Sequence, residues 1–149
     1  MKYFPQECIL TLEELNKLCE EWKSVLGLEN WNTSIKICRD DDMEGGAGHC
    51  HWVLPIQCAD IKILDHVDWY KIIDHFPQDM EKTIVHELLH CRFAVIDKAE
   101  DGTLEELILH QNIDMLACAL VGIKREANGN AFEKGKGEEN NFKKFLRNG

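Results

Sequence analysis

The pattern of apolar and polar positions predicts a helix followed by three short strands. Between residues 12 and 26, apolar side chains recur at helical spacing. Thr11 and Glu14 form a capping-box pattern before this segment, and Gly27 is suited to end it. Three later runs alternate with the period of two that is typical of strands, at residues 33–39, 47–54 and 58–64. We expect these runs to form a small, mostly antiparallel sheet.

Helical spacing returns in the second half of the chain, where it predicts two further helices. The first covers about residues 78–95, because Pro77 stands where a first helical residue is favoured. Thr103 and Glu106 form a second capping-box pattern, which begins a helix that runs to about residues 124–125. The apolar spacing within the first of these helices predicts its buried positions: Met80, Ile84, Val85, Leu88, Leu89 and Ala94.

These elements together predict an α+β fold in a single domain. The 149 residues suffice for one hydrophobic core and are too few for two comfortable ones. We assign residues 1–126 to this domain. Residues 127–149 are rich in glycine, asparagine and mixed charge, which predicts a polar, flexible tail. Within the tail, Phe142, Phe145 and Leu146 would suit a short docked helix.

Charge and cysteine usage limit the partners and the compartment. The net charge of -10 argues against a nucleic-acid or anionic-membrane surface, since those partners need clustered lysine and arginine. The sequence contains no run of about 18 apolar residues, so it does not predict a membrane-spanning helix. The seven cysteines are scattered and form no C-x-x-C pair, which indicates reduced thiols. We therefore expect a cytoplasmic protein.

The segment from Lys82 to Phe93 carries the motif that indicates chemistry. His86 and His90 are four residues apart, so on a helix both imidazoles project from one face and can bind one cation. Glu87 lies one residue round from that face, within reach of a metal-bound water. This division of labour is why an H-E-x-x-H sequence on a helix predicts a catalytic zinc site with a glutamate base.

A third ligand is required, because two histidines rarely hold a catalytic zinc alone. The downstream candidates are Glu100, Glu105, Glu106, His110 and Asp114. Glu106 already serves the capping box, and acidic residues such as Glu105 are expected in a first helical turn anyway. His110 and Asp114 stand one turn apart among mostly apolar residues, where polar groups need a partner. We expect His110 to bind the metal and Asp114 to accept a hydrogen bond from a ligating histidine. The reverse assignment and a metal-free His110–Asp114 hydrogen bond are the alternatives.

The spacing of these residues resembles that of the gluzincins, the thermolysin-like zinc metallopeptidases. Their pattern is H-E-x-x-H on one helix and E-x-x-x-D on the next, with the glutamate twenty residues after the second histidine. Here His110 lies twenty residues after His90, and Asp114 follows at the fourth position. The compact layout also resembles small bacteriophage metallopeptidases and minimal gluzincins. The resemblance covers about residues 47–125, and Phe93 stands where a metzincin would need glycine.

The resemblance implies zinc as the cofactor and a role for each matching residue. His86 and His90 would bind zinc, Glu87 would act as base and acid, and Asp114 would support a ligand. The chain departs from the family in having His110 in place of glutamate, although histidine is an ordinary zinc ligand. The implied activity is hydrolysis of a peptide bond in a peptide or protein substrate. The alternatives are a zinc-binding interaction module without turnover and a metal-free helical domain.

The family fold also places an edge strand beside the active-site helix, where a substrate peptide adds as another strand. Residues 45–55 are our candidate for this strand. His49 and His51 share one of its faces and are suited to polarise a carbonyl, or to form a second metal site with Cys50 or Cys58. Simple strand alternation explains both histidines without a function.

Overall fold

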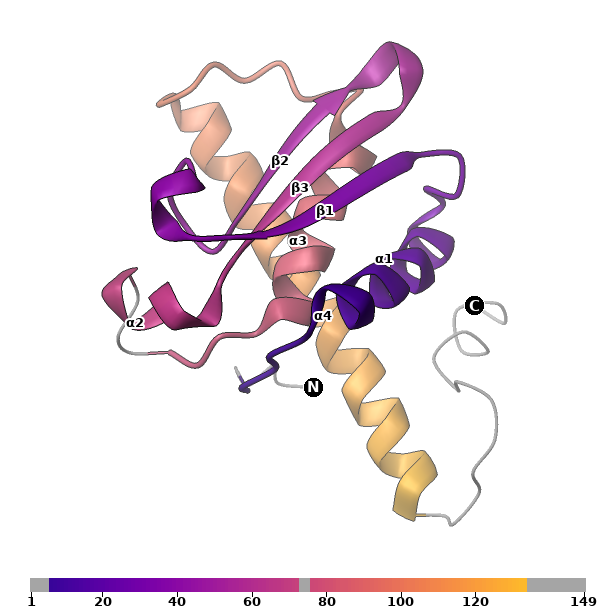
Figure 1. Ribbon diagram of the computed structural model, residues 1–149. Coiled ribbons are helices and arrows are strands. Elements are labelled where there is room, and N and C mark those ends of the chain that lie inside the picture. Colours follow the sequence, from indigo (N-terminus) through magenta and orange to yellow (C-terminus); the bar gives the residue numbers. More distant parts are fainter. Residues whose placement is uncertain (1–5, 73–75, 134–149) are drawn as a thin grey trace.

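The computed structural model describes residues 6–72 and 76–133. An N-terminal helix, α1 (Leu12–Leu26), is followed by a sheet of three strands and then by helices α3 (Met80–Phe93) and α4 (Leu104–Glu133) (Figure 1). Short 3-10 turns and the four-residue helix α2, Trp69–Ile72, connect these elements. This order confirms the predicted α+β fold class.

Helix α1 spans Leu12–Leu26 and has the predicted ends. The backbone N–H of Glu14 donates to Thr11 Oγ1 at 3.2 Å, and the Glu14 carboxylate accepts from the backbone N–H of Thr11 at 3.0 Å. Gly27 ends the helix with φ +70°, a left-handed conformation that glycine adopts without strain. Both ends were predictable because capping depends on residues close in the sequence.

The sheet is mixed, with the strand order β1-β3-β2. Strand β1, Asn32–Cys38, pairs in parallel with β3, Cys58–Leu64, and Ile35 lies opposite Ile61. Strand β2, Gly48–Val53, pairs antiparallel with β3. One of the two pairings is thus parallel, where we expected a mostly antiparallel sheet. Alternation within one strand identifies its buried face and carries no information about the direction of its partner.

Helix α3 spans Met80–Phe93 and begins later than predicted. Asp79, rather than Pro77, precedes it, and its side chain accepts a hydrogen bond from the backbone N–H of Lys82 at 3.1 Å. An aspartate at this position satisfies one of the unpaired N–H groups of the first turn. All six positions predicted to be buried on this helix are buried.

Helix α4 spans Leu104–Glu133 and is longer than predicted. The predicted polar tail therefore begins with helix, because α4 continues through residues 127–133. Phe142, Phe145 and Leu146, which suited a short docked helix, lie outside the described residues.

The core lies between α3 and its neighbours. Ile84, Val85 and Leu88 on α3 are completely buried, and in Figure 1 this helix lies behind the sheet with α4 further back. Ile113 and Val121 of α4 are also completely buried, on the face that packs against α3. The packing therefore holds α3 between the sheet and α4, which places the H-E-x-x-H motif at the junction of all three.

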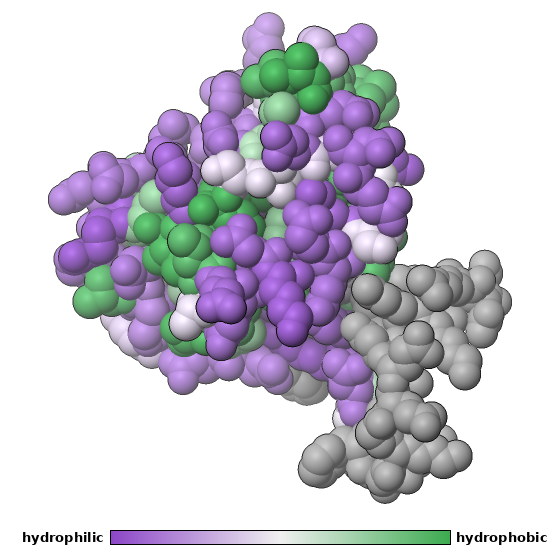
Figure 2. Space-filling view, turned by 45° about the vertical axis from the view of Figure 1, so that its right-hand side comes forward, coloured by the Kyte–Doolittle hydropathy of each residue, from purple (hydrophilic) through white to green (hydrophobic). Residues whose placement is uncertain are grey.

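The outer face of α4 is unusually apolar. Residues Leu104–Gly129 are long and apolar enough to cross a membrane by length and composition, a test that core helices of soluble proteins also pass. Leu104 and Met115 are 66% and 70% exposed. By contrast, the face of the molecule drawn in Figure 2 is mostly hydrophilic, with hydrophobic areas broken up by polar side chains. The absence of a membrane partner stays a prediction.

Candidate metal centre

Helices α3 and α4 bring three histidines together. His86 and His90 lie one turn apart on α3, and His110 faces them from α4. The ring centroid of His90 is 5.2 Å from that of His86 and 4.7 Å from that of His110. One nitrogen from each ring lies within 4.8 Å of the other two. Three imidazoles at this spacing form a group that could bind one metal ion.

Asp114 supports the first of these histidines. Its Oδ1 lies 3.2 Å from His86 Nδ1, and the same oxygen accepts a hydrogen bond from Lys82 Nζ. The hydrogen bond with His86 is the largest cause that lowers the pKa of Asp114 below its usual range, and Lys82 acts in the same direction. A carboxylate here favours the tautomer with the proton on His86 Nδ1, which leaves Nε2 with a lone pair.

His90 is the most buried of the three, with 7% of its surface exposed. The indole ring of Trp52 stacks on it at 5.8 Å between ring centroids. Burial is the main cause that lowers the pKa of His90 to about 3, followed by the nearby His86 and His110. Among the residues that the structure describes, nothing hydrogen-bonds to its buried Nδ1. A neutral imidazole with an unpartnered nitrogen suits a metal ligand, since metals bind the deprotonated form.

Glu87 is held in a confined, buried position next to the histidines. The residue is 5% exposed, and burial raises the pKa of its carboxyl to about 8 against the opposing effect of Lys82. Gly48 on β2 passes so close that a Cβ there would lie 2.8 Å from Glu87 Oε1. Glycine therefore allows the strand to approach the helix at this carboxylate.

A pocket of about 670 Å³ opens at this junction. Strand β2, helix α3, the connection between α3 and α4, and the first turns of α4 all contribute to its lining. The three histidines, Glu87 and Asp114 all line it. The pocket is large enough for several residues of a peptide beside the histidines.

The other candidates for a third ligand are placed differently. Glu106 lines the pocket, but its carboxylate accepts a hydrogen bond from the backbone N–H of Gly102. Thr103 Oγ1 accepts a hydrogen bond from the backbone N–H of Glu106 at 3.3 Å, so the helix start is capped. The Glu106 carboxylate accepts from the N–H of Gly102, where a capping box would have the N–H of Thr103. Glu100 and Glu105 do not line the pocket. In the described part of the chain, the group of side chains suited to one metal ion contains His110 and none of these carboxylates.

Our reason for choosing His110 was only partly right. We expected it to lie among buried apolar residues, but His110 itself is exposed, and Leu107 and Ile108 are 55% and 48% exposed. The Asp114 side chain also keeps 46% of its surface exposed. The position of His110 toward α3, rather than burial, brings it to the other two histidines.

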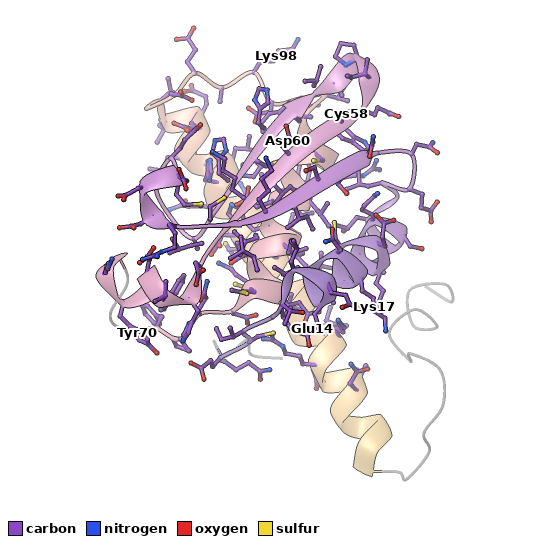
Figure 3. The ribbon with its side chains drawn as sticks, viewed as in Figure 1. Glu14, Lys17, Cys58, Asp60, Tyr70 and Lys98 are labelled. Carbon is purple, nitrogen blue, oxygen red and sulfur yellow. The ribbon has the colours of Figure 1, made fainter. Side chains whose placement is uncertain are left out.

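The two histidines of strand β2 have separate surroundings. His49 lines the pocket, and its Nε2 lies 2.8 Å from Glu44 Oε2. His51 is exposed and lies opposite Asp60, which Figure 3 labels on the sheet. The described residues contain no second group of three ligands around either histidine.

The nearby thiols do not complete a second site either. Cys50 is buried with its Sγ 3.7 Å from Cys91 Sγ. Cys58, labelled in Figure 3 at the start of β3, donates to the backbone carbonyl of Ile56 at 3.6 Å. A role in polarising a carbonyl stays a prediction for His49 and His51.

Two side chains whose chemistry would suit the stabilisation of an oxyanion do not line the pocket: Tyr70 and Arg92. Tyr70 is 59% exposed on α2, and in Figure 3 it lies at the opposite end of the molecule from Lys98 of the α3–α4 connection. Gly48 and Trp52 line the pocket from within the predicted edge strand, residues 45–55. Four polar lining residues were not singled out from the sequence: Lys82, Thr83, Asp97 and Asp101. Lys82 precedes His86 by one helical turn, a spacing visible in the sequence, whereas the two aspartates reach the pocket through the path of the α3–α4 connection.

In comparisons with known proteins, no family model, no curated protein and no solved structure matches this chain. The resemblance to gluzincins therefore rests on the motif and its spacing. The geometry independently supports a candidate three-histidine metal site that spans two helices.

Proposed function

We propose that the protein is a cytoplasmic zinc metallopeptidase. The observation that carries the proposal is the convergence of His86, His90 and His110 beside the buried carboxylate of Glu87. Three histidines with an open fourth position are a known ligand set for catalytic zinc. The low pKa of His90, and its Nδ1 without a partner among the described residues, fit such an ion.

Each residue then has a role that follows from its position. Zinc, when bound, supplies a Lewis acid that activates water and polarises a carbonyl. Glu87 takes the proton from the attacking water and delivers it to the leaving amine. A cation beside this carboxylate favours its ionised form, which counteracts the burial that raises its pKa. Asp114 keeps the ring of His86 in one orientation through the hydrogen bond at Nδ1.

Strand β2 supports the peptide part of the proposal. It lies at the edge of the described sheet, and its residues Gly48, Cys50 and Trp52 line the pocket. An edge strand beside a catalytic group can pair with an extended peptide through main-chain hydrogen bonds. We therefore place the substrate between residues 45–55 and the three histidines.

One observation favours a different class of function, a zinc-binding interaction module without turnover. Lys82 is the one lysine or arginine among the described lining residues, and Asp114 already holds its ammonium group. The pocket therefore offers no unengaged cationic side chain to a developing oxyanion. In that case a partner peptide would bind at β2 without being cleaved.

Metal analysis followed by one substitution separates these functions. We expect purified protein to bind zinc at one ion per chain and to hydrolyse an unfolded protein substrate. Glu87→Gln should keep the zinc and lose the hydrolysis, because the amide cannot act as a base. Glu13→Gln, an exposed change on α1, serves as the matched control and should keep both properties. Equal inertness of wild type and Glu87→Gln toward a broad peptide library would favour the interaction module, and a chain that takes up no zinc would exclude both.

A further inference from the structure

The pocket beside the histidines carries an excess of negative charge. The described lining residues include one lysine and no arginine. Against that one ammonium group, the lining contains five acidic side chains: Glu87, Asp97, Asp101, Glu106 and Asp114. Two of them belong to the candidate metal centre, since Glu87 is the proposed base and Asp114 holds both His86 and Lys82.

The remaining three carboxylates come from neighbouring segments of the chain. Asp97 and Asp101 belong to the connection between α3 and α4, and Glu106 to the first turn of α4. Backbone N–H groups serve two of them: Ala99 donates to Asp97 Oδ1 at 3.3 Å, and Gly102 donates to Glu106. No lysine or arginine of the described chain forms an ion pair with any of the three. Lys98 lies on the same connection but does not line the pocket.

A second observation indicates that this pocket takes a ligand. His90 is 93% buried and lines the same cavity, yet its Nδ1 has no hydrogen-bond partner among the described residues. Buried polar atoms are almost always paired, so an unpaired one beside a cavity indicates that a bound group completes the site. The carboxylates of Asp97, Asp101 and Glu106 therefore line the same cavity as the candidate ligand site.

We infer that this cavity selects peptides with a positive charge next to the segment held at the three histidines. The inference rests on the proposed peptide-binding function and names the chemistry of its substrate. An ammonium or guanidinium group at Asp97, Asp101 and Glu106 would gain charge-assisted hydrogen bonds, whereas an acidic side chain would be repelled. A bound dication would offset only part of the negative lining, because its two charges and that of Lys82 do not balance five carboxylates.

The charge has two sources in a peptide, a basic side chain or a free amino terminus. We would measure binding of fluorescein-labelled short peptides by anisotropy, with a central lysine, norleucine or glutamate and with both ends blocked. A norleucine peptide with a free amino terminus identifies the second source. Two forms of the full chain would be measured. The first is the zinc-loaded Glu87→Gln variant, which lacks the proposed base, and the second is wild type in the presence of a chelator.

We expect the lysine peptide, the free-amine peptide or both to bind about three- to tenfold more tightly than blocked norleucine, with the preference falling as salt rises. Asp97→Asn with Asp101→Asn should remove the preference, since asparagine keeps the hydrogen-bonding capacity and loses the charge. The control variant combines Glu13→Gln with Glu29→Gln, which removes the same amount of charge at exposed positions elsewhere. It should leave the preference for cationic peptides within about twofold of the unmodified value.

Equal affinity for all blocked and free peptides would overturn the inference. An equal loss of the preference in the double aspartate variant and in the double glutamate control would also overturn it. The measurement with a chelator distinguishes failure of this inference from failure of the proposed function. If wild type binds no zinc but still prefers the cationic peptides, the metallopeptidase proposal fails and the charge selection stands.

Discussion

Helix α3 carries two clusters of buried polar groups, and they differ in how completely their groups are paired. Near its start, Glu81 accepts a hydrogen bond from Trp22 Nε1 at 3.0 Å and pairs with Lys124. Asp79 there holds the guanidinium of Arg125 at 2.7 and 2.8 Å. Further along the helix, His90 Nδ1 has no hydrogen-bond partner in the described part of the chain, and the pKa of Glu87 is raised by burial.

The difference separates a structural cluster from a ligand site. Charges that are buried and fully paired fix α3 against α1 and α4, and they gain nothing from an added ion. Groups that are buried and incompletely paired lower stability unless a ligand satisfies them. The two clusters should therefore respond oppositely to mutation, one in the free energy of unfolding and the other in metal affinity.

The largest expected effect is on zinc binding when His110 is replaced by alanine. Structural zinc sites bind with about 10–16 kcal/mol, so the loss of one of a few ligands should weaken affinity by about 100- to 1000-fold. Because His110 is exposed, the unfolding free energy of the metal-free protein should change by less than about 0.5 kcal/mol. Competition with a chromophoric chelator measures the affinity.

Gln111→Ala is the matched control, since Gln111 is the exposed neighbour of His110 on α4. Its zinc affinity should equal that of wild type. If His110→Ala also binds zinc like wild type, His110 is not a ligand, and the alternative with Asp114 on the metal becomes the better assignment.

The structural cluster should show the opposite response when Glu81 is replaced by alanine. This change leaves the indole N–H of Trp22 and the ammonium of Lys124 without their shared carboxylate. Removing one partner of a buried ion pair costs about 3 kcal/mol, measurable by urea denaturation. Zinc affinity should stay within about twofold. Glu81→Gln keeps an acceptor for Trp22 and should lose less; an equal loss would show that charge alone matters here.

Much of the fold could be predicted because the relevant information is local. The capping box of Thr11 and Glu14 and the buried positions of α3 depend on residues within one or two turns. The parallel pairing of β1 with β3 depends on residues far apart in the sequence, so alternation alone did not reveal it. Helix α4 also continues past Gly129, because glycine and asparagine disfavour a helix by only about 1 kcal/mol per residue or less.

The site divides in the same way. The spacing of His86, Glu87 and His90 follows from helical geometry, so their shared position was predictable. The approach of His110 depends on how α4 packs on α3, and its spacing was informative although its expected burial was wrong. The stacking of Trp52 on His90 requires β2 to cross α3, which no pattern within either element indicates.

The pH dependence of stability sharpens the comparison at Glu87. The folded metal-free protein holds this proton more tightly than the unfolded chain, since the pKa is raised from 4.5 to about 8. The resulting stabilisation is fully present below about pH 4.5 and is lost as the pH rises through about 8. Glu87→Gln, which stays neutral, should therefore become more stable relative to wild type by about 3 kcal/mol between about pH 5 and pH 8. Urea denaturation with a chelator present measures this. If the stability difference between the variant and wild type does not change with pH, the pKa of Glu87 is the same in the folded and unfolded chains.

The smallest effect is expected for Gly48→Ala, where the sign is informative. An added Cβ would lie 2.6 Å from Thr83 Cγ2 and 2.8 Å from Glu87 Oε1, so β2 and α3 must separate slightly, at a cost of about 1–2 kcal/mol. Without that contact, alanine in a strand would instead stabilise by about 0.5–1 kcal/mol. Thr83→Ser removes Cγ2 and keeps the hydroxyl that donates to the Asp79 carbonyl at 3.1 Å. In that background Gly48→Ala should cost less, with the remaining loss assigned to Glu87. If Gly48→Ala stabilises wild type, the strand does not confine this carboxylate, and the pocket cluster loses its distinction from the paired cluster at Glu81.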